Sequence, residues 1–108
     1  MDKIFETPLS KPLALVNKNA DRWVKSLHAK YKKAKNQFGV EYAWDAKHCA
    51  LLLRSRKCGV SGVIQFNEKT VSGYIKLPLL LKPLAALYRD SVAREVQAEI
   101  KAFLKTLK

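Results

Sequence analysis

The stretch that decides the fold is Cys58–Leu77, "CGVSGVIQFNEKTVSGYIKL", in which the tripeptide Val-Ser-Gly occurs twice. In each copy the second residue after the glycine is an isoleucine. β-Branched and aromatic residues on both sides of the polar segment Asn67–Thr70 predict two strands joined by a turn. The repeat serves either the packing of this hairpin or contact with a ligand.

The predicted register of the hairpin favours packing. With the turn centred on Glu68 and Lys69, each glycine lies opposite an isoleucine on the apolar side of the sheet. The expected pairs are Phe66 with Val71, Ile64 with Gly73, Gly62 with Ile75, and Val60 with Leu77. Glycine within a strand often marks a close approach by another part of the chain, so we expect the isoleucines to lean into the gaps. A phosphate-binding loop needs glycine between a strand and a helix.

The remaining elements follow from hydrophobic periodicity. Strands are predicted at Val40–Asp45, His48–Ser55, Val60–Phe66 and Val71–Leu77, forming an antiparallel meander, with a further edge strand around Ile4 and Phe5. Apolar residues at steps of three and four predict one long helix from Pro12 to Ala34, and a second helix runs from Pro83 nearly to the end. We therefore expect one α+β domain, residues 1–108, in which an N-terminal and a C-terminal helix cover one face of a four-stranded meander.

The net charge of the chain is strongly positive. The 108 residues include 21 Lys and Arg but only 9 Asp and Glu, which gives +12. Such an excess attracts nucleic acid, anionic lipid and acidic protein alike, although a solvated basic face that only confers solubility is the alternative. No signal-peptide pattern and no apolar run of about 18 residues is present, so we expect a cytoplasmic protein without a membrane span.

The residues most often used in catalysis are not grouped in the sequence. Cys49 and Cys58 are predicted near opposite ends of one strand, about 20 Å apart, which excludes a shared metal or disulfide and favours two small hydrophobic residues. Neither His28 nor His48 has a second ligand at metal spacing, and adjacent strand residues such as His48 and Cys49 point to opposite faces. We therefore predict no enzyme activity, metal or cofactor.

Cationic residues gather in two segments. Lys25, Lys32, Lys33 and Lys35 lie toward the end of the first helix, and Arg54, Arg56 and Lys57 lie at a hairpin tip. If the two segments share one side, they form a patch for an anionic partner such as nucleic acid. Lysines at a helix C-terminus also complement the helix dipole without any partner. Tyr74 is the aromatic residue predicted on the polar sheet face, where it is a candidate for stacking on bases.

The last helix carries an apolar stripe close to a heptad repeat. Its candidate interaction residues are Ile100, Phe103, Leu104 and Leu107. Core packing is the first interpretation of this stripe. The alternatives are pairing with a second subunit to form a homodimer, or contact with an apolar surface such as lipid or a polymer granule.

The order of motifs resembles the polyhydroxyalkanoic acid system family of small bacterial proteins over nearly the full length. The matching segments are Trp44-Asp45, Leu51 and Leu53, Gly59-Val60-Ser61-Gly62-Val63-Ile64, Leu77-Pro78-Leu79-Leu80-Leu81, and the helix through Ile100 and Leu104. Two segments depart from the family pattern. Thr7–Ser10 stands where members carry a His-x-Leu-Gly-like sequence, and Ala46-Lys47 stands where Gly-Asp is expected.

The resemblance implies an accessory role in polyhydroxyalkanoate storage, with a granule or granule protein as partner, and implies no catalytic residues. Nucleic acid is the alternative partner, and a dimeric structural protein is a third hypothesis.

Overall fold

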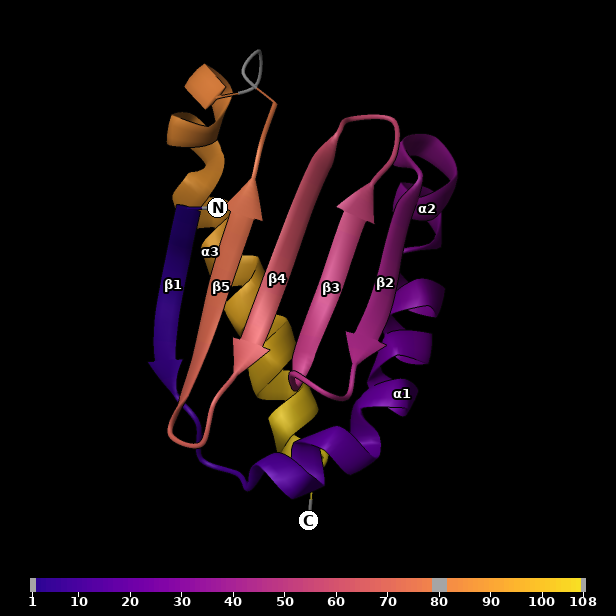
Figure 1. The fold of residues 1–108 in the computed structure, drawn as a ribbon. Helices are drawn as coiled ribbons and strands as arrows, with labels where there is room; N and C mark the ends of the chain where they lie inside the picture. The colour runs from indigo at the N-terminus through magenta and orange to yellow at the C-terminus, as the bar shows by residue number, and fades with distance from the viewer. Residues whose placement is uncertain (1, 79–81, 108) are drawn as a thin grey trace.

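The computed structural model describes residues 2–78 and 82–107. The elements, in chain order, are β1 (Asp2–Pro8), α1 (Leu13–Lys30), α2 (Lys32–Phe38), β2 (Val40–Asp45), β3 (Ala50–Ser55), β4 (Val60–Phe66), β5 (Thr70–Lys76) and α3 (Lys82–Lys105). Figure 1 shows the strands side by side in one sheet, with the long helix α3 crossing behind them. Leu79–Leu81, part of the family-like leucine motif, lie outside the described residues.

The sheet has five strands in the order β1-β5-β4-β3-β2, and all neighbours are antiparallel. The predicted meander is therefore confirmed, and the N-terminal edge strand is also present. β1 pairs with β5, the last strand of the meander, with one irregularity between Lys3 and Phe5. The sequence predicted four strands with the fifth only as an addition, because an edge strand paired along one side carries a weak local signal.

The register of the Val-Ser-Gly hairpin is confirmed. Ile64 pairs with Gly73 and Gly62 pairs with Ile75, and both glycines are buried. The prediction that the isoleucines fill the gaps is wrong. The space beside each glycine is occupied by a side chain from the strand on its other side. A Cβ added to Gly73 would lie 2.1 Å from the ring of Phe5 on β1, and one added to Gly62 would lie 3.1 Å from Leu53 on β3.

The N-terminal helix is divided, whereas the sequence predicted one helix. The break lies at Tyr31, whose backbone angles of −108° and 36° are not helical. The Tyr31 hydroxyl donates a hydrogen bond to the Glu99 carboxylate on α3, so the side chain is anchored to a helix far away in the sequence. α2 then ends at Gly39, which has a left-handed φ of 63° and closes the helix in the usual way.

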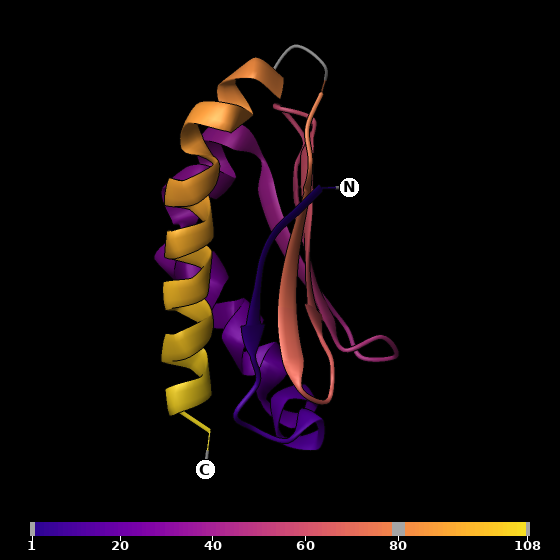
Figure 2. The same cartoon turned by 90° about the vertical axis from the view of Figure 1, so that its left-hand side faces the viewer.

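The core lies between the sheet and the two long helices. The Trp23 ring on α1 stacks on Phe103 of α3, with centroids 4.4 Å apart, and meets Phe66 of β4 edge-on at 6.0 Å. The buried core residues include Phe5, Val16, Leu27, Leu51, Val71, Ile100, Leu104 and Leu107. Figure 2 shows both α1 and α3 on one side of the sheet, while no helix of the described residues covers the opposite side.

Side chains from the helices contact both edges of the sheet. His28 of α1 accepts a hydrogen bond from the backbone N–H of Tyr42 on the edge strand β2, at 3.1 Å. Arg89 of α3 donates to the backbone carbonyl of Lys3 on the other edge strand, β1. Unpaired strand edges invite pairing with other chains, so these two contacts protect the sheet where it ends.

Candidate functional site

Two cationic segments meet at one end of the molecule. The C-terminal end of α2 and the β3–β4 turn are joined by hydrogen bonds, three of which involve Phe38 or Gly39 at the end of the helix. Arg56 N–H donates to the Gly39 carbonyl at 3.2 Å, Lys57 N–H donates to the Phe38 carbonyl at 3.3 Å, and the Ser55 hydroxyl donates to the same carbonyl at 2.6 Å. We give the name basic corner to the six cationic residues on and beside these two segments. They are Lys32, Lys33, Lys35, Arg54, Arg56 and Lys57.

The basic corner is exposed and has little internal neutralisation. All six cationic side chains are exposed. Arg56 lies 2.9 Å and Arg54 lies 3.7 Å from the Glu41 carboxylate of β2. The Lys57 ammonium donates to the Asn36 carbonyl at 3.4 Å, at the negative end of α2. The cations therefore outnumber the carboxylate they surround, and the corner has a positive potential.

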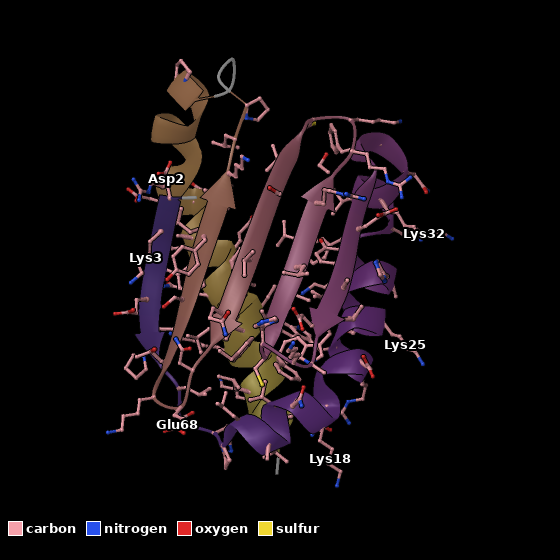
Figure 3. All side chains as sticks on the ribbon, in the orientation of Figure 1. Asp2, Lys3, Lys18, Lys25, Lys32 and Glu68 are labelled. Atoms are coloured by element: carbon pink, nitrogen blue, oxygen red, sulfur yellow. The ribbon has the colours of Figure 1, made fainter. Side chains whose placement is uncertain are left out.

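The structure brings together six of the seven residues of the predicted cationic patch. Lys25 is the exception, because it lies on α1 rather than on either segment of the corner. Figure 3 shows Lys18, Lys25 and Lys32 pointing outward along one side of the helices, beside the β2 edge. Lys25 therefore belongs to a row of exposed lysines that runs along the helices toward the basic corner.

Phe38 lies within the basic corner and was missed by the sequence analysis. Its side chain is 47% exposed, the largest exposure among the large hydrophobic residues described. The signal was present in "KKAKNQFG", where Phe38 follows the last position of the helix stripe among charged and polar neighbours. An exposed aromatic ring beside several lysines provides an apolar contact and a cationic contact to the same partner.

The predicted interaction residues of the last helix are core residues. Ile100 is 1% exposed, Phe103 5%, Leu104 8% and Leu107 3%. The stripe packs against the sheet and against α1, which agrees with the interpretation as core packing. In this fold these four side chains do not form a free surface for a second subunit or a granule.

His48 lies in the β2–β3 turn rather than at the start of a strand. Its Nδ1 is 2.7 Å from one oxygen of Asp45, and its backbone N–H donates to the other oxygen at 3.2 Å. The hydrogen bond from the His48 side chain lowers the pKa of Asp45 from its ordinary value. The Asp45–His48 pair therefore stabilises a tight turn, in which Cys49 has a positive φ of 49°.

A shallow depression lies next to this turn, between it and the β4–β5 turn. It is lined by Leu13, Lys47, His48, Cys49, Gln65, Phe66, Asn67, Glu68, Lys69 and Thr70. The nearest polar contact of the Cys49 sulfur is the Ala46 carbonyl, at 4.0 Å, and the side chain packs against the core. The depression is therefore bordered by His48, which is hydrogen-bonded to Asp45, and by Cys49, which packs against the core.

Metal ligands are not clustered in the part of the chain that the structure describes. No group of three His, Cys, Asp or Glu residues is close enough there to hold an ion. Cys49 and Cys58 are free thiols on either side of β3, as the sequence predicted, and both are half-buried. No helix within residues 2–78 and 82–107 has the length and apolar character to cross a bilayer.

A partly buried polar cluster links the two long helices. The Glu99 carboxylate of α3 accepts hydrogen bonds from Tyr31 and from the Lys30 ammonium. Burial raises the pKa of Glu99, but the hydrogen bonds from Lys30 and Tyr31 outweigh burial, and the pKa is lowered overall. Burial and the neighbouring Glu99 both raise the pKa of the Tyr31 hydroxyl. The cluster is structural, since it ties α1 to α3.

Comparison with known proteins gives one match. The model of a family described as "Putative polyhydroxyalkanoic acid system protein" matches residues 5–105. No curated protein and no solved structure matches the chain.

Proposed function

Because the chain belongs to the polyhydroxyalkanoic acid system family, we propose that it is a non-enzymatic accessory protein of polyhydroxyalkanoate storage. In this proposal the protein binds the granule surface or a granule-associated protein through the basic corner. The absence of enzyme activity is part of the proposal. It is supported by the scattered acidic residues and by the engagement of His48 with Asp45.

The observation that carries the proposal is the exposed Phe38 among six cations on two segments that are hydrogen-bonded to each other. Because α2 and the β3–β4 turn are already fixed, a partner does not have to order them, which lowers the cost of binding. Cationic side chains attract an anionic surface, and an aromatic ring enters its apolar boundary. The apolar stripe of α3 is buried, so the corner replaces it as the candidate contact.

Granule fractionation tests this proposal. In cells that make the polymer, we expect the wild-type protein in the granule fraction and the double variant Lys33→Glu/Lys35→Glu mostly in the supernatant. The matched control is Lys101→Glu/Lys105→Glu, which makes the same change of charge at exposed positions of α3, toward the opposite end of the molecule. Full recovery of the wild-type protein in the supernatant would contradict the proposal, as would equal loss in the control.

Nucleic acid is the second candidate partner, because the same corner combines cations with an aromatic ring that can stack on bases. If four lysines contact phosphates of duplex DNA, the logarithm of the binding constant should fall with the logarithm of salt concentration with a slope of about −3.6. No binding of short DNA or RNA at low salt would remove this candidate. Binding that Lys33→Glu/Lys35→Glu leaves unchanged would place it elsewhere on the protein.

A further inference from the structure

The face of the sheet opposite the helices carries an ordered pattern of side chains. The pairings place Ala43, Leu52, Val63 and Tyr74 in one row across β2, β3, β4 and β5, and the row ends at Lys3 on β1. Leu52 is 40% exposed. The Lys3 ammonium lies over the Tyr74 ring, 6.0 Å from its centroid. An apolar row therefore crosses the middle of this open face, which is turned toward the viewer in Figure 1.

Two polar rows flank the apolar row, one on each side. Toward the β3–β4 turn lie Glu41, Arg54, Ser61 and Lys76, and toward the β4–β5 turn lie Asp45, Ala50, Gln65, Ser72 and Glu6. The first row carries two cations, one of which, Arg54, is near Glu41. The second row carries a carboxylate on each of the two edge strands. The apolar row thus separates a mainly basic row from an acidic row.

The open face is nearly neutral although the chain has a net charge of +12. Its cations are Lys3, Arg54 and Lys76, and its anions are Glu6, Glu41 and Asp45. A binding face for a polyanion would share the positive excess of the basic corner. A balanced face with both signs in separate rows fits a partner that presents the same pattern in reverse.

We propose that the open face binds a second copy of this chain. A two-fold axis along the apolar row superposes that row on itself and turns the basic row of one copy over the acidic row of the other. Because the axis runs across the strands, each strand lies over the same strand of the partner. Lys76 on β5 is then one strand away from the partner's Glu6 on β1, and Arg54 on β3 is one strand away from the partner's Asp45 on β2. Contacts of this kind are isologous, and each forms twice.

The complementarity is weakest at two places, where like charges meet. Lys3 lies on the axis and meets the partner's Lys3, and each Lys3 is paired with Glu6 of its own copy, 2.8 Å away. Glu41 comes opposite the partner's Asp45 in this arrangement. Glu41 is held by Arg54 and Arg56, however, and Asp45 is hydrogen-bonded to His48, so each carboxylate already has a partner within its own chain. The attractive pairs Lys76 with Glu6 and Arg54 with Asp45 therefore decide the orientation, and the apolar row supplies the contact area.

The area of the face sets the strength of the dimer. Five strands about 4.8 Å apart and about 20 Å long cover roughly 480 Å² on each copy. The total, about 960 Å², is just below the range of stable specific interfaces, which begins near 1,200 Å². We therefore expect a weak, reversible dimer that dissociates in about the micromolar range or above, and that is absent from dilute samples.

Sedimentation equilibrium over a series of concentrations, from about micromolar to about millimolar, tests the proposal. The wild-type protein should pass from monomer to dimer, and Leu52→Lys should weaken association at least tenfold, because it places a charge in the apolar row. Leu52 is already exposed, so this variant keeps the fold, which circular dichroism can verify. A monomer at every concentration overturns the proposal, and so does undiminished dimerisation of Leu52→Lys.

A charge exchange tests the orientation. Lys76→Glu should weaken the dimer by its clash with the partner's Glu6, and Lys76→Glu/Glu6→Lys should restore it, since the sign of each contact is reversed on both copies. Lys101→Glu is the matched control, because it makes the same change of charge on the helix side. Failure of the double variant to recover any association rejects the stated axis. The open face shares only Arg54 with the basic corner and does not include Lys33 or Lys35, so the outcome of the granule test does not decide this one.

Discussion

At the scale of single residues, Gly73 has the most restrictive surroundings in the sheet. The ring of Phe5 lies where its side chain would be, and the nearest ring carbon would be 2.1 Å from an added Cβ. Phe5 is itself 7% exposed, and it carries the N-terminal strand into the core. The second glycine of the repeat therefore joins the N-terminal strand to the hairpin that ends the meander.

We predict that Gly73→Ala lowers the free energy of unfolding by about 1–3 kcal/mol, because overpacking forces Phe5 to move. Thermal unfolding should show a decrease in Tm of several degrees for each kcal/mol. Gly62→Ala is the matched control, since a Cβ there would lie 3.1 Å from Leu53 and 3.3 Å from the Tyr74 carbonyl oxygen, which is a milder overlap than the one with Phe5. Phe5→Leu/Gly73→Ala should lose less stability than the sum of its single changes. Equal losses for Gly62→Ala and Gly73→Ala would contradict this explanation.

The surroundings of Glu99 shift its pKa, and this shift makes the stability of the protein depend on pH. Its pKa in the folded state lies below the ordinary value of 4.5, so the carboxylate binds protons more readily in the unfolded chain. Its contribution to stability is therefore complete above that value and is lost as the pH falls through the lowered pKa. The difference in unfolding free energy between wild type and Glu99→Gln should shrink as the pH is lowered from about 6 to about 3.

Urea unfolding at several pH values measures this difference. Glu95→Gln is the control, because Glu95 lies on the same helix and is exposed. A constant difference between wild type and Glu99→Gln at all pH values would show that the Lys30 and Tyr31 contacts do not depend on the charge of Glu99.

At the scale of secondary-structure elements, the two edge strands are held in different ways. β1 ends the sheet beside the N-terminal half of α3, where Arg89 contacts the Lys3 carbonyl. β2 ends the sheet beside α1, where His28 accepts from the Tyr42 N–H. The imidazole needs an unprotonated Nε2 to accept this bond, so the helix satisfies a strand N–H that no neighbouring strand reaches.

We predict that His28→Ala speeds hydrogen exchange at the Tyr42 amide by about tenfold, because its acceptor is removed from a partly buried edge. Amides of β4, in the middle of the sheet, serve as the internal reference, since they change only with global stability. His28→Gln should restore part of the protection through its side-chain carbonyl. Acceleration spread evenly over all strands would mean that His28 supports the whole fold and not this edge.

Hydrophobic periodicity predicted the buried side of α1 but not the point at which this helix ends. Steps of three and four correctly placed Val16, Ala20, Trp23 and Leu27 in the core, and period two correctly placed the strands of the meander. The break at Tyr31 was not predictable from that pattern, because the apolar stripe continues through it. Tyr31 is held by Glu99, 68 residues away, and a contact at such a separation leaves no periodic signal.

At the scale of the whole molecule, the two candidate surfaces differ in character. The basic corner is a concentration of like charge around Phe38, and the open face has equal numbers of both signs around an apolar row. The first supports a partner of opposite charge, and the second supports self-association. The two surfaces share Arg54, which pairs with Glu41, so they adjoin at this residue of β3.

The amino-acid sequence alone determined the hairpin register, the meander, the helices on one face and the family. Each of these is encoded in hydrophobic periodicity or in a local motif. The sequence also named seven cations, six of which meet at the corner, but their meeting depends on backbone hydrogen bonds between α2 and the β3–β4 turn. Only the tertiary structure decided that Phe5 and Leu53 fill the glycine gaps, that the α3 stripe is core, and that Phe38 is exposed. The physical reason is that burial depends on which distant segments pack together, whereas periodicity records only which side of an element is apolar.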